Sequence, residues 1–148
     1  MILTLDTNII VQSLSGNRGA SYYILDLFYN KKVDIAISLP VFYEYEDVLN
    51  RPNILEKILL EKEDIQNVLR FILLRAKKQD IFFLFRPNLK DEKDNIFIEL
   101  SLKSNSDYLI TNNIRDFKYN NNLKFPSIKI ITPSDFVKEW KNNYENKE

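Results

Sequence analysis

Short apolar runs alternate with amphipathic segments along the chain, and this alternation constrains the fold more than any other feature. We predict strands at residues 2–6, 34–38, 81–85, 107–111 and 128–131. Between most of these runs, apolar residues recur every three or four positions, as they do on one face of a helix. Strands that alternate with helices are typical of βαβ units, in which helices cover both faces of a parallel sheet. The pattern therefore predicts an α/β fold.

The predicted helices follow from the same periodicity and from the positions of proline. We expect helices at residues 7–13, 20–30, 40–50 and 91–104, and a last helix that begins after the capping residue Thr132. Residues 54–78 form a longer helical region, broken near Lys62. The expected core positions of that region are Ile65, Val68, Leu69, Ile72 and Leu73.

The length of the chain, 148 residues, suits one domain. We place this domain at residues 1–141 and expect a disordered tail at residues 142–148. No apolar stretch approaches the roughly 20 residues that span a bilayer, and no charged region precedes the first apolar run. We therefore expect a cytoplasmic protein with no membrane partner.

The chain contains neither cysteine nor histidine. Their absence excludes disulfides, thiolate or imidazole metal sites, and catalysis by Ser-His or Cys-His pairs. The remaining protein ligands for a metal ion are oxygen atoms, which favour Mg²⁺ or Mn²⁺. The composition therefore favours an acidic metal site if the chain has a metal site at all. The formal net charge is zero, so any nucleic-acid contact would depend on local basic patches.

Four acids fall where predicted strands end or where neighbouring helices begin. They are Asp6, Glu44, Asp94 and Asp116. In open α/β sheets, ligand sites collect beyond the carboxyl ends of the strands, so these acids are expected to converge. Carboxylates that converge repel one another unless cations neutralise them. One or two divalent ions would do so, and a second ion could hold the attacking and leaving oxygens of a phosphodiester.

Each of the four acids also has an ordinary structural explanation. Asp6, together with Asn8, would cap the helix that follows. Glu44 would pair with a lysine or arginine, because an unpaired buried charge is costly. The negative charge of Asp94 would stabilise the N-terminus of its helix, and Asp116 would form a turn. The shared location of the acids, rather than any one of them, favours a common site.

Four segments of the chain carry a resemblance to a known family. They are LDTNIIV at 5–11, SLPVFYEYEDVLNRP at 38–52, KDEKDNIFIELSLKSNSDYLITNNIRDF at 90–117 and ITPSDF at 131–136. In their order and spacing they resemble the PIN-domain nucleases, particularly the VapC-like toxins of bacterial toxin-antitoxin systems. The resemblance covers nearly the whole chain. It implies a PIN-like three-layer α/β/α fold with a central parallel sheet of about four or five strands.

The resemblance also implies roles for individual residues. The catalytic acids that bind Mg²⁺ or Mn²⁺ would be Asp6, Glu44, Asp94 and Asp116. If Asp94 faces away from the site, Asp91 would take its place. The polar residues that support them would be Asn8, Thr111 and Asn113. Many family members have an acid where this chain has Asn113. Asp116 would replace that acid, as in members with a Thr-x-Asn-x-x-Asp-Phe pattern.

The activity that the resemblance implies is endoribonuclease cleavage, in which water attacks a phosphodiester of RNA. The implied partners are RNA, a small protein antitoxin that masks the site, and a second copy of the chain. Exposed apolar residues between Ile54 and Leu73 could pair the two copies. Candidate RNA contacts are Arg18, Lys31, Lys32, Arg115 and Lys118, with Tyr22 or Tyr119 as stacking surfaces. The ordinary explanation for these cations is a solvated basic surface.

Other functions remain open at this point. A PIN fold could bind RNA or a protein without cutting, or could cut RNA during RNA processing. Haloacid-dehalogenase-type phosphatases need a second acid two residues after the first, where this chain has Asn8. Response-regulator receivers need an acidic pair and a late lysine after a strand, and neither is evident.

Overall fold

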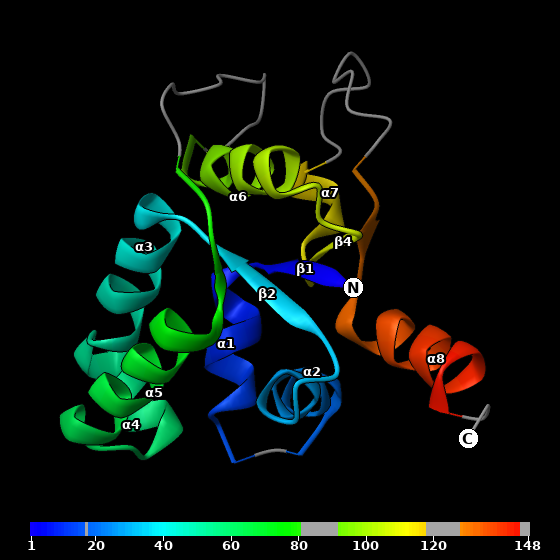
Figure 1. The fold of residues 1–148 in the computed structure, drawn as a ribbon. Helices are drawn as coiled ribbons and strands as arrows, with labels where there is room; N and C mark the ends of the chain where they lie inside the picture. The colour runs from blue at the N-terminus through cyan, green and yellow to red at the C-terminus, as the bar shows by residue number, and fades with distance from the viewer. Residues whose placement is uncertain (17, 81–91, 118–127, 146–148) are drawn as a thin grey trace.

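The chain forms a parallel sheet with helices on both faces in a computed structural model (Figure 1). The structure describes residues 1–16, 18–80, 92–117 and 128–145, without the side chains of residues 92–94. Over these residues the sheet has five strands in the order β3-β2-β1-β4-β5. The strands are β1 (Ile2–Leu5), β2 (Asp34–Ile37), β3 (Lys77–Lys78), β4 (Tyr108–Ile110) and β5 (Ile130–Ile131). The predicted three-layer α/β/α fold with a parallel sheet is confirmed.

The helices form the two outer layers and one flank of the molecule. They are α1 (Thr7–Ser13), α2 (Ala20–Tyr29), α3 (Leu39–Leu49), α4 (Pro52–Ile58), α5 (Lys62–Arg75), α6 (Glu92–Ser104), α7 (Ile114–Phe117) and α8 (Pro133–Asn143). Helix α6 packs on one face against β1, β2 and β4, whereas α1 and α2 lie on the opposite side (Figure 1). Helices α3, α4 and α5 flank the sheet, and α8 packs against α2. None of the described helices is long and apolar enough to cross a membrane.

The central strands are apolar because both faces of the sheet are covered. Leu3 of β1, Ile35 of β2 and Leu109 of β4 are fully buried. Burial of one such side chain contributes about 1.5–3 kcal/mol to stability. In the register, Leu3 is opposite Ile35 on one side and Tyr108 on the other, so the three strands end at the same edge.

Two helix starts follow the predicted capping chemistry. Ser38 precedes α3, and its hydroxyl accepts a hydrogen bond from the N–H of Val41. Thr132 precedes α8 and accepts from the N–H of Asp135 at 3.2 Å. In both helices a proline occupies the first turn, where its missing N–H costs nothing. These caps begin α3 and α8 directly after β2 and β5.

The segment that follows α5 differs from the prediction. Helix α5 ends at Arg75, whereas the helical region was expected to reach residue 78. Lys77 and Lys78 instead pair with Ala36 and Ile37 as the edge strand β3. Helical periodicity did not reveal this strand because two exposed lysines, although typical of an edge strand, show no apolar alternation. The strand predicted at 81–85 lies outside the described residues.

One predicted core position of α5 is wrong. Leu73 is 38% exposed, whereas Ile65, Leu69 and Ile72 are buried. These three residues are spaced by four and three positions and form the face that packs inward. Leu73 lies beside that face, where a side chain is only partly covered.

The C-terminal residues extend α8 beyond the expected domain boundary at residue 141. The helix reaches Asn143, and the ring of Tyr144 stacks on Trp140 with a centroid distance of 4.6 Å. The hydroxyl of Tyr23 donates a hydrogen bond to Oε2 of Glu145 at 2.5 Å. Residues 146–148 lie outside the described part of the chain.

Candidate active site

Three strands end together at the edge of the sheet that carries the candidate acids. β1 leads to Asp6 and α1, β2 leads to Ser38 and α3, and β4 leads to Thr111 and α7. The main-chain N–H of Asp6 donates to the carbonyl of Ile110 at 3.0 Å, which continues the β1–β4 ladder to this edge. The parallel pairing therefore places residues far apart in the sequence next to one another.

Asp6 is held by a hydroxyl from the neighbouring strand. Its side chain is only 7% exposed, and Oδ2 accepts a hydrogen bond of 2.7 Å from Oγ1 of Thr111. The N–H of Thr111 donates to the carbonyl of Ile131 on β5 at 3.0 Å. Sheet hydrogen bonds thus set the main chain of both residues, and the side-chain bond orients the carboxylate.

Helix capping does not explain the Asp6 side chain. Asp6 occupies the N-cap position of α1, but its side chain forms no capping hydrogen bond. Because the side chain turns to Thr111 instead, the capping role considered for Asp6 is wrong.

Asp116 lies close enough to Asp6 to affect its ionisation. It is half-buried in the first turn of α7, and its N–H donates to the carbonyl of Asn113 at 3.0 Å. Burial raises the pKa of Asp6, and the negative charge of Asp116 raises it further. The hydrogen bonds from the Thr111 hydroxyl and from the main-chain N–H of Thr7 lower this pKa. The site therefore concentrates negative charge at a place where water is largely excluded.

Thr111 connects these groups through both functions of its hydroxyl. While Oγ1 donates to Asp6, it accepts a hydrogen bond of 3.0 Å from the N–H of Asn113. The side chain of Asn113 is exposed. The loop between β4 and α7 is thus folded back on the hydroxyl that holds Asp6.

Glu44 lies on α3, the helix that follows β2. It is half-buried, and in the part of the chain that the structure describes it forms no salt bridge. The next residue, Tyr45, is fully buried, and its hydroxyl donates to the carbonyl of Leu5 at 2.5 Å. Burial and the nearby charge of Asp6 both raise the pKa of Tyr45. Tyr45 therefore connects the helix that carries Glu44 to the strand that ends at Asp6.

The remaining predicted site residues are less fully described. Asp94 belongs to the first turn of α6, but its side chain lies outside the described part of the structure. Asp91, Lys118 and Tyr119 also fall outside it. Asn8 is exposed near the start of α1. Among the side chains that are described, which include Asp6, Glu44 and Asp116, no three acids form a group that could hold a metal ion.

A PIN domain family model matches residues 3–115, about three quarters of the chain. The chain belongs to the PIN domain family. Among solved structures, the chain resembles one chain of VapBC2 from Rickettsia felis, solved bound to a DNA fragment from their promoter. The two chains are 24% identical, the TM-score is 0.58, and the similarity covers 89% of this chain and 98% of the other. No curated protein sequence matches the chain.

The family match confirms the resemblance to PIN domains found in the sequence. PIN domains are generally nucleases. The family match covers Asp6, Glu44, Asp94 and Thr111 and ends one residue before Asp116. The similarity to VapBC2 concerns the fold.

The candidate donor atoms of this PIN domain are oxygens, the kind of ligand that a divalent ion such as Mg²⁺ or Mn²⁺ prefers. The candidate ligands are carboxylates, and Asp6 is buried without a salt bridge to any described lysine or arginine. The hydroxyl of Thr7, the next residue, is also buried and has no hydrogen-bond partner among the described residues. A hard cation would offset the cost of placing negative charge in this environment. Asp6, Glu44, Asp94 and Asp116 are the residues that would hold it.

Sequence reasoning missed a polar connection beside the PIN site. Oε1 of Gln12 on α1 accepts hydrogen bonds from Nδ2 of Asn112 at 2.8 Å and from Oγ of Ser21 at 2.9 Å. Asn112 directly follows Thr111, so Gln12 helps to hold the loop after β4. A glutamine in an exposed position of a short helix gives no sequence signal for such a contact.

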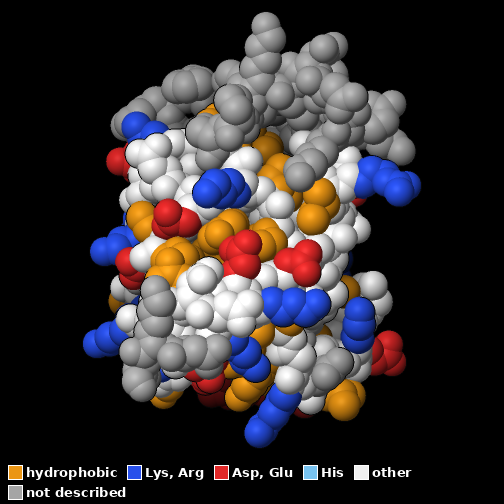
Figure 2. Space-filling model, turned by 90° about the vertical axis from the view of Figure 1, so that its right-hand side faces the viewer, with side chains coloured by type: hydrophobic (Ala, Val, Ile, Leu, Met, Phe, Trp, Pro, Cys, Tyr) orange, Lys and Arg blue, Asp and Glu red, His pale blue; other side chains and the backbone are white. Residues whose placement is uncertain are grey.

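The candidate RNA contacts do not form one group. Arg115 is exposed on α7, next to Asp116, while Arg18 lies over the ring of Tyr22 at the start of α2, with its Cζ 5.7 Å from the ring centroid. Lys31 and Lys32 are exposed after α2. On the face that carries β5 and α8, acidic, basic and apolar side chains are interspersed (Figure 2). Arg115 is therefore the described cation with the clearest relation to the acids.

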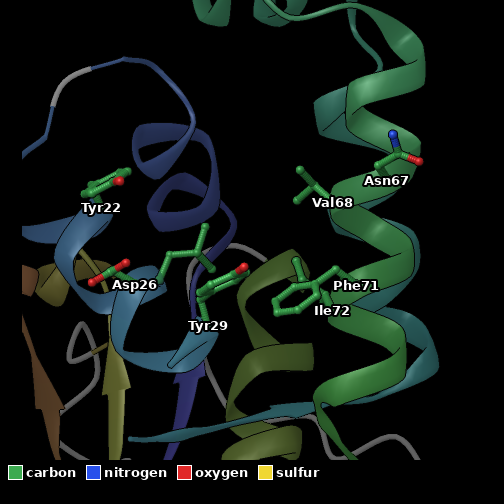
Figure 3. A pocket seen from close by; sticks show the side chains of 8 residues that line it. Tyr22, Asp26, Tyr29, Asn67, Val68, Phe71 and Ile72 are labelled. Carbon is green, nitrogen blue, oxygen red and sulfur yellow. The ribbon is translucent and has the colours of Figure 1, made fainter. Parts of the chain in front are cut away.

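A separate apolar pocket lies between α2 and α5 (Figure 3). Its volume is about 440 Å³. The residues that line it are Tyr22, Leu25, Asp26, Tyr29, Asn67, Val68, Phe71 and Ile72. Asp6, Glu44 and Asp116, the candidate catalytic acids whose side chains are described, do not line this pocket, so it is distinct from the site at the sheet edge.

Proposed function

We propose that this PIN domain is an endoribonuclease that depends on Mg²⁺ or Mn²⁺. The observation that supports this function is the buried carboxylate of Asp6, hydrogen-bonded to Thr111 and close to the charge of Asp116. Keeping a carboxylate buried beside a second acid is unfavourable in the absence of a cation. In a nuclease, the same arrangement serves to bind a metal ion next to a phosphodiester.

The roles of the residues follow from their surroundings. Asp6, Glu44, Asp94 and Asp116 would hold the ion, and Thr111 would keep the Asp6 carboxylate in one orientation. A bound Mg²⁺ or Mn²⁺ would lower the pKa of the attacking water and stabilise charge on the phosphate. A carboxylate of the cluster would orient that water and accept its proton. Arg115, exposed beside Asp116, would contact the RNA backbone.

The test of this function compares substitutions of Glu44 and Asp6 in an RNA-cleavage assay. Structured and single-stranded RNA are incubated with the wild type, Asp6→Asn and Glu44→Gln, in Mg²⁺, Mn²⁺ or EDTA. Glu46→Gln is the matched control, because Glu46 lies on α3 two residues away but is exposed. We expect cleavage by the wild type and by Glu46→Gln only when a metal ion is present. Loss of a ligand should reduce the rate by more than about 100-fold.

A non-cutting module would give a different result. If the wild type binds RNA equally in Mg²⁺ and EDTA but leaves it intact, the nuclease proposal fails and the binding function replaces it. If cleavage persists in EDTA and in Asp6→Asn, the proposed site is wrong.

We further propose that the chain is the toxin of a toxin-antitoxin pair and acts in the cytoplasm as a homodimer. The support is the family resemblance of the sequence together with the similarity of the fold to a chain of VapBC2. Expression of the wild type in bacteria should then stop growth, whereas expression of Asp6→Asn should not. Light scattering of the purified protein should give twice the mass of one chain. A PIN nuclease of RNA processing would cleave RNA without stopping growth.

A further inference from the structure

A row of three aromatic rings is buried beside the candidate site. The rings of Tyr45 and Phe97 have centroids 6.5 Å apart, and those of Phe97 and Phe117 are also 6.5 Å apart, in an edge-to-face arrangement. Tyr45 is fully buried, and the other two side chains are each 2% exposed. These three residues are called the aromatic row below.

Each ring belongs to an element that carries one of the candidate acids. Tyr45 directly follows Glu44 on α3, and Phe117 directly follows Asp116 on α7. Phe97 lies in α6, one helical turn after Asp94. Through its hydroxyl, Tyr45 also contacts β1, because it donates to the carbonyl of the residue before Asp6. The aromatic row therefore touches the elements of all four acids.

The sheet alone does not set the separation of these elements. Hydrogen bonds between strands place the ends of β1 and β4, but α3 and α6 lie outside the sheet and contact each other (Figure 1). Consecutive residues of a helix point about 100° apart, so a ring fixed in the core sets the direction in which the preceding acid leaves the helix. Side-chain packing at the aromatic row thus adds to the direct packing of α6 on β1, β2 and β4 in relating the helices to the strand ends.

We propose that the aromatic row is a positioning device that sets the mutual distances of the metal-binding acids, with Tyr45 as the member that has the greatest effect. This inference rests on the proposed metal-dependent function. Tyr45 has the greatest effect because it joins α3 to α6 through its ring and α3 to β1 through its hydroxyl. Loss of its hydroxyl leaves the ring in the core but frees the end of β1 from α3.

The experiment measures Mn²⁺ affinity by calorimetry for matched pairs of variants of the full chain. Tyr45→Phe is compared with Tyr108→Phe, which also loses one tyrosine hydrogen bond, from the hydroxyl to Glu139 at 2.6 Å. Tyr108 is the first residue of β4, at the opposite edge of the sheet. We expect Mn²⁺ affinity to fall about tenfold in Tyr45→Phe, as for groups that orient metal ligands, and to stay unchanged in Tyr108→Phe.

A second pair of variants tests the packing of the aromatic row and leaves the Tyr45 hydroxyl unchanged. Phe117→Leu is compared with Phe28→Leu, since Phe28 is equally buried and also makes an edge-to-face contact, with Phe71 at 5.6 Å. Phe28 lies in the last turn of α2, which leads to the amino end of β2. Both variants should unfold at a lower temperature, but only Phe117→Leu should bind Mn²⁺ more weakly. This pair also decides the matter if Tyr45→Phe does not fold.

The outcomes separate the positioning role from the proposed function. Weaker Mn²⁺ binding in Tyr45→Phe and Phe117→Leu, with wild-type affinity in both controls, supports the positioning role. Equal affinity in all folded variants overturns it, while the proposed function stands. If Mn²⁺ affinity simply follows the unfolding temperature in all variants, the row is only structural and the inference fails. If the wild type binds no Mn²⁺, the proposed function fails and the inference fails with it.

Discussion

The hydroxyl of Thr111 donates a 2.7 Å hydrogen bond to the carboxylate of Asp6 across 105 residues of sequence. This bond is almost completely shielded from solvent, since Thr111 is fully buried and Asp6 is 7% exposed. It joins the loop after β1 to the loop after β4 at the edge where the candidate acids lie.

Thr111→Val should destabilise the protein and raise the pKa of Asp6 further, because the hydrogen bond that favours the charged carboxylate is lost. The loss in the free energy of unfolding should be about 1–3 kcal/mol, measured by urea denaturation. Thr4→Val is the matched control, since Thr4 is also fully buried and its hydroxyl shares a 2.8 Å hydrogen bond with Ser106. The control should lose stability without a change in the titration of Asp6 or in RNA cleavage. An unchanged Asp6 titration in Thr111→Val would contradict this prediction.

Asp6→Asn should make the metal-free protein more stable at pH 7. Burial raises the pKa of Asp6, so the stability contributed by its protonated form is present at low pH and is lost as the pH rises through the folded-state pKa. The asparagine variant avoids this loss. In EDTA, the unfolding temperature of Asp6→Asn should therefore exceed that of the wild type at pH 7, and the difference should become smaller as the pH is lowered.

Mn²⁺ should reverse the order of stability of these two proteins. The wild type should gain unfolding temperature with added Mn²⁺, because the ion binds the folded state, whereas Asp6→Asn should gain little. Asp26→Asn, which changes an exposed acid on α2, is the control. Equal stabilisation of the wild type and Asp6→Asn by Mn²⁺ would show that the ion binds elsewhere.

Asp116→Asn should reduce RNA cleavage by at least about tenfold, and a second substitution should restore part of it. Asn113 occupies the position where many PIN domains have an acid, and its carbonyl accepts from the N–H of Asp116 in the same turn. The double variant Asn113→Asp/Asp116→Asn moves the acid to that position. Cleavage rates in Mn²⁺ measure the recovery, with Asp135→Asn on α8 as the control. Full activity of Asp116→Asn would show that Asp116 has no part in the site.

Leu59→Gly should stabilise the protein by about 0.5–1 kcal/mol. Leu59 ends α4 with φ of 58°, a left-handed conformation that is unfavourable for a leucine, and its side chain is 87% exposed. Glycine adopts this conformation without steric cost and is the common residue after a helix. Leu74→Gly is the control, because Leu74 is 73% exposed within α5 and its replacement should destabilise the helix. Chemical denaturation measures the free energy of unfolding of both variants. A loss of stability in Leu59→Gly would contradict the prediction.

Much of the architecture could be predicted because its signals are local. The apolar runs that became β1, β2 and β4, and the capping residues Ser38 and Thr132, are visible in a few consecutive residues. Strand β3 could not be found in this way, since Lys77 and Lys78 form a strand only by pairing with β2. The position of Asp6 after β1 indicated the site, but the sequence did not show whether its side chain capped α1 or turned elsewhere.

The packing of the chain decided that question. Asp6 turns to Thr111 because parallel pairing brings β1 beside β4, and the hydroxyl of Tyr45 reaches Leu5 because α3 packs against α1, the helix that follows β1. Periodicity along the chain can assign a residue to a strand end or to the inward face of a helix. It cannot assign the partner of that residue, because such contacts join elements that are remote in sequence and depend on how the whole sheet and its helices pack.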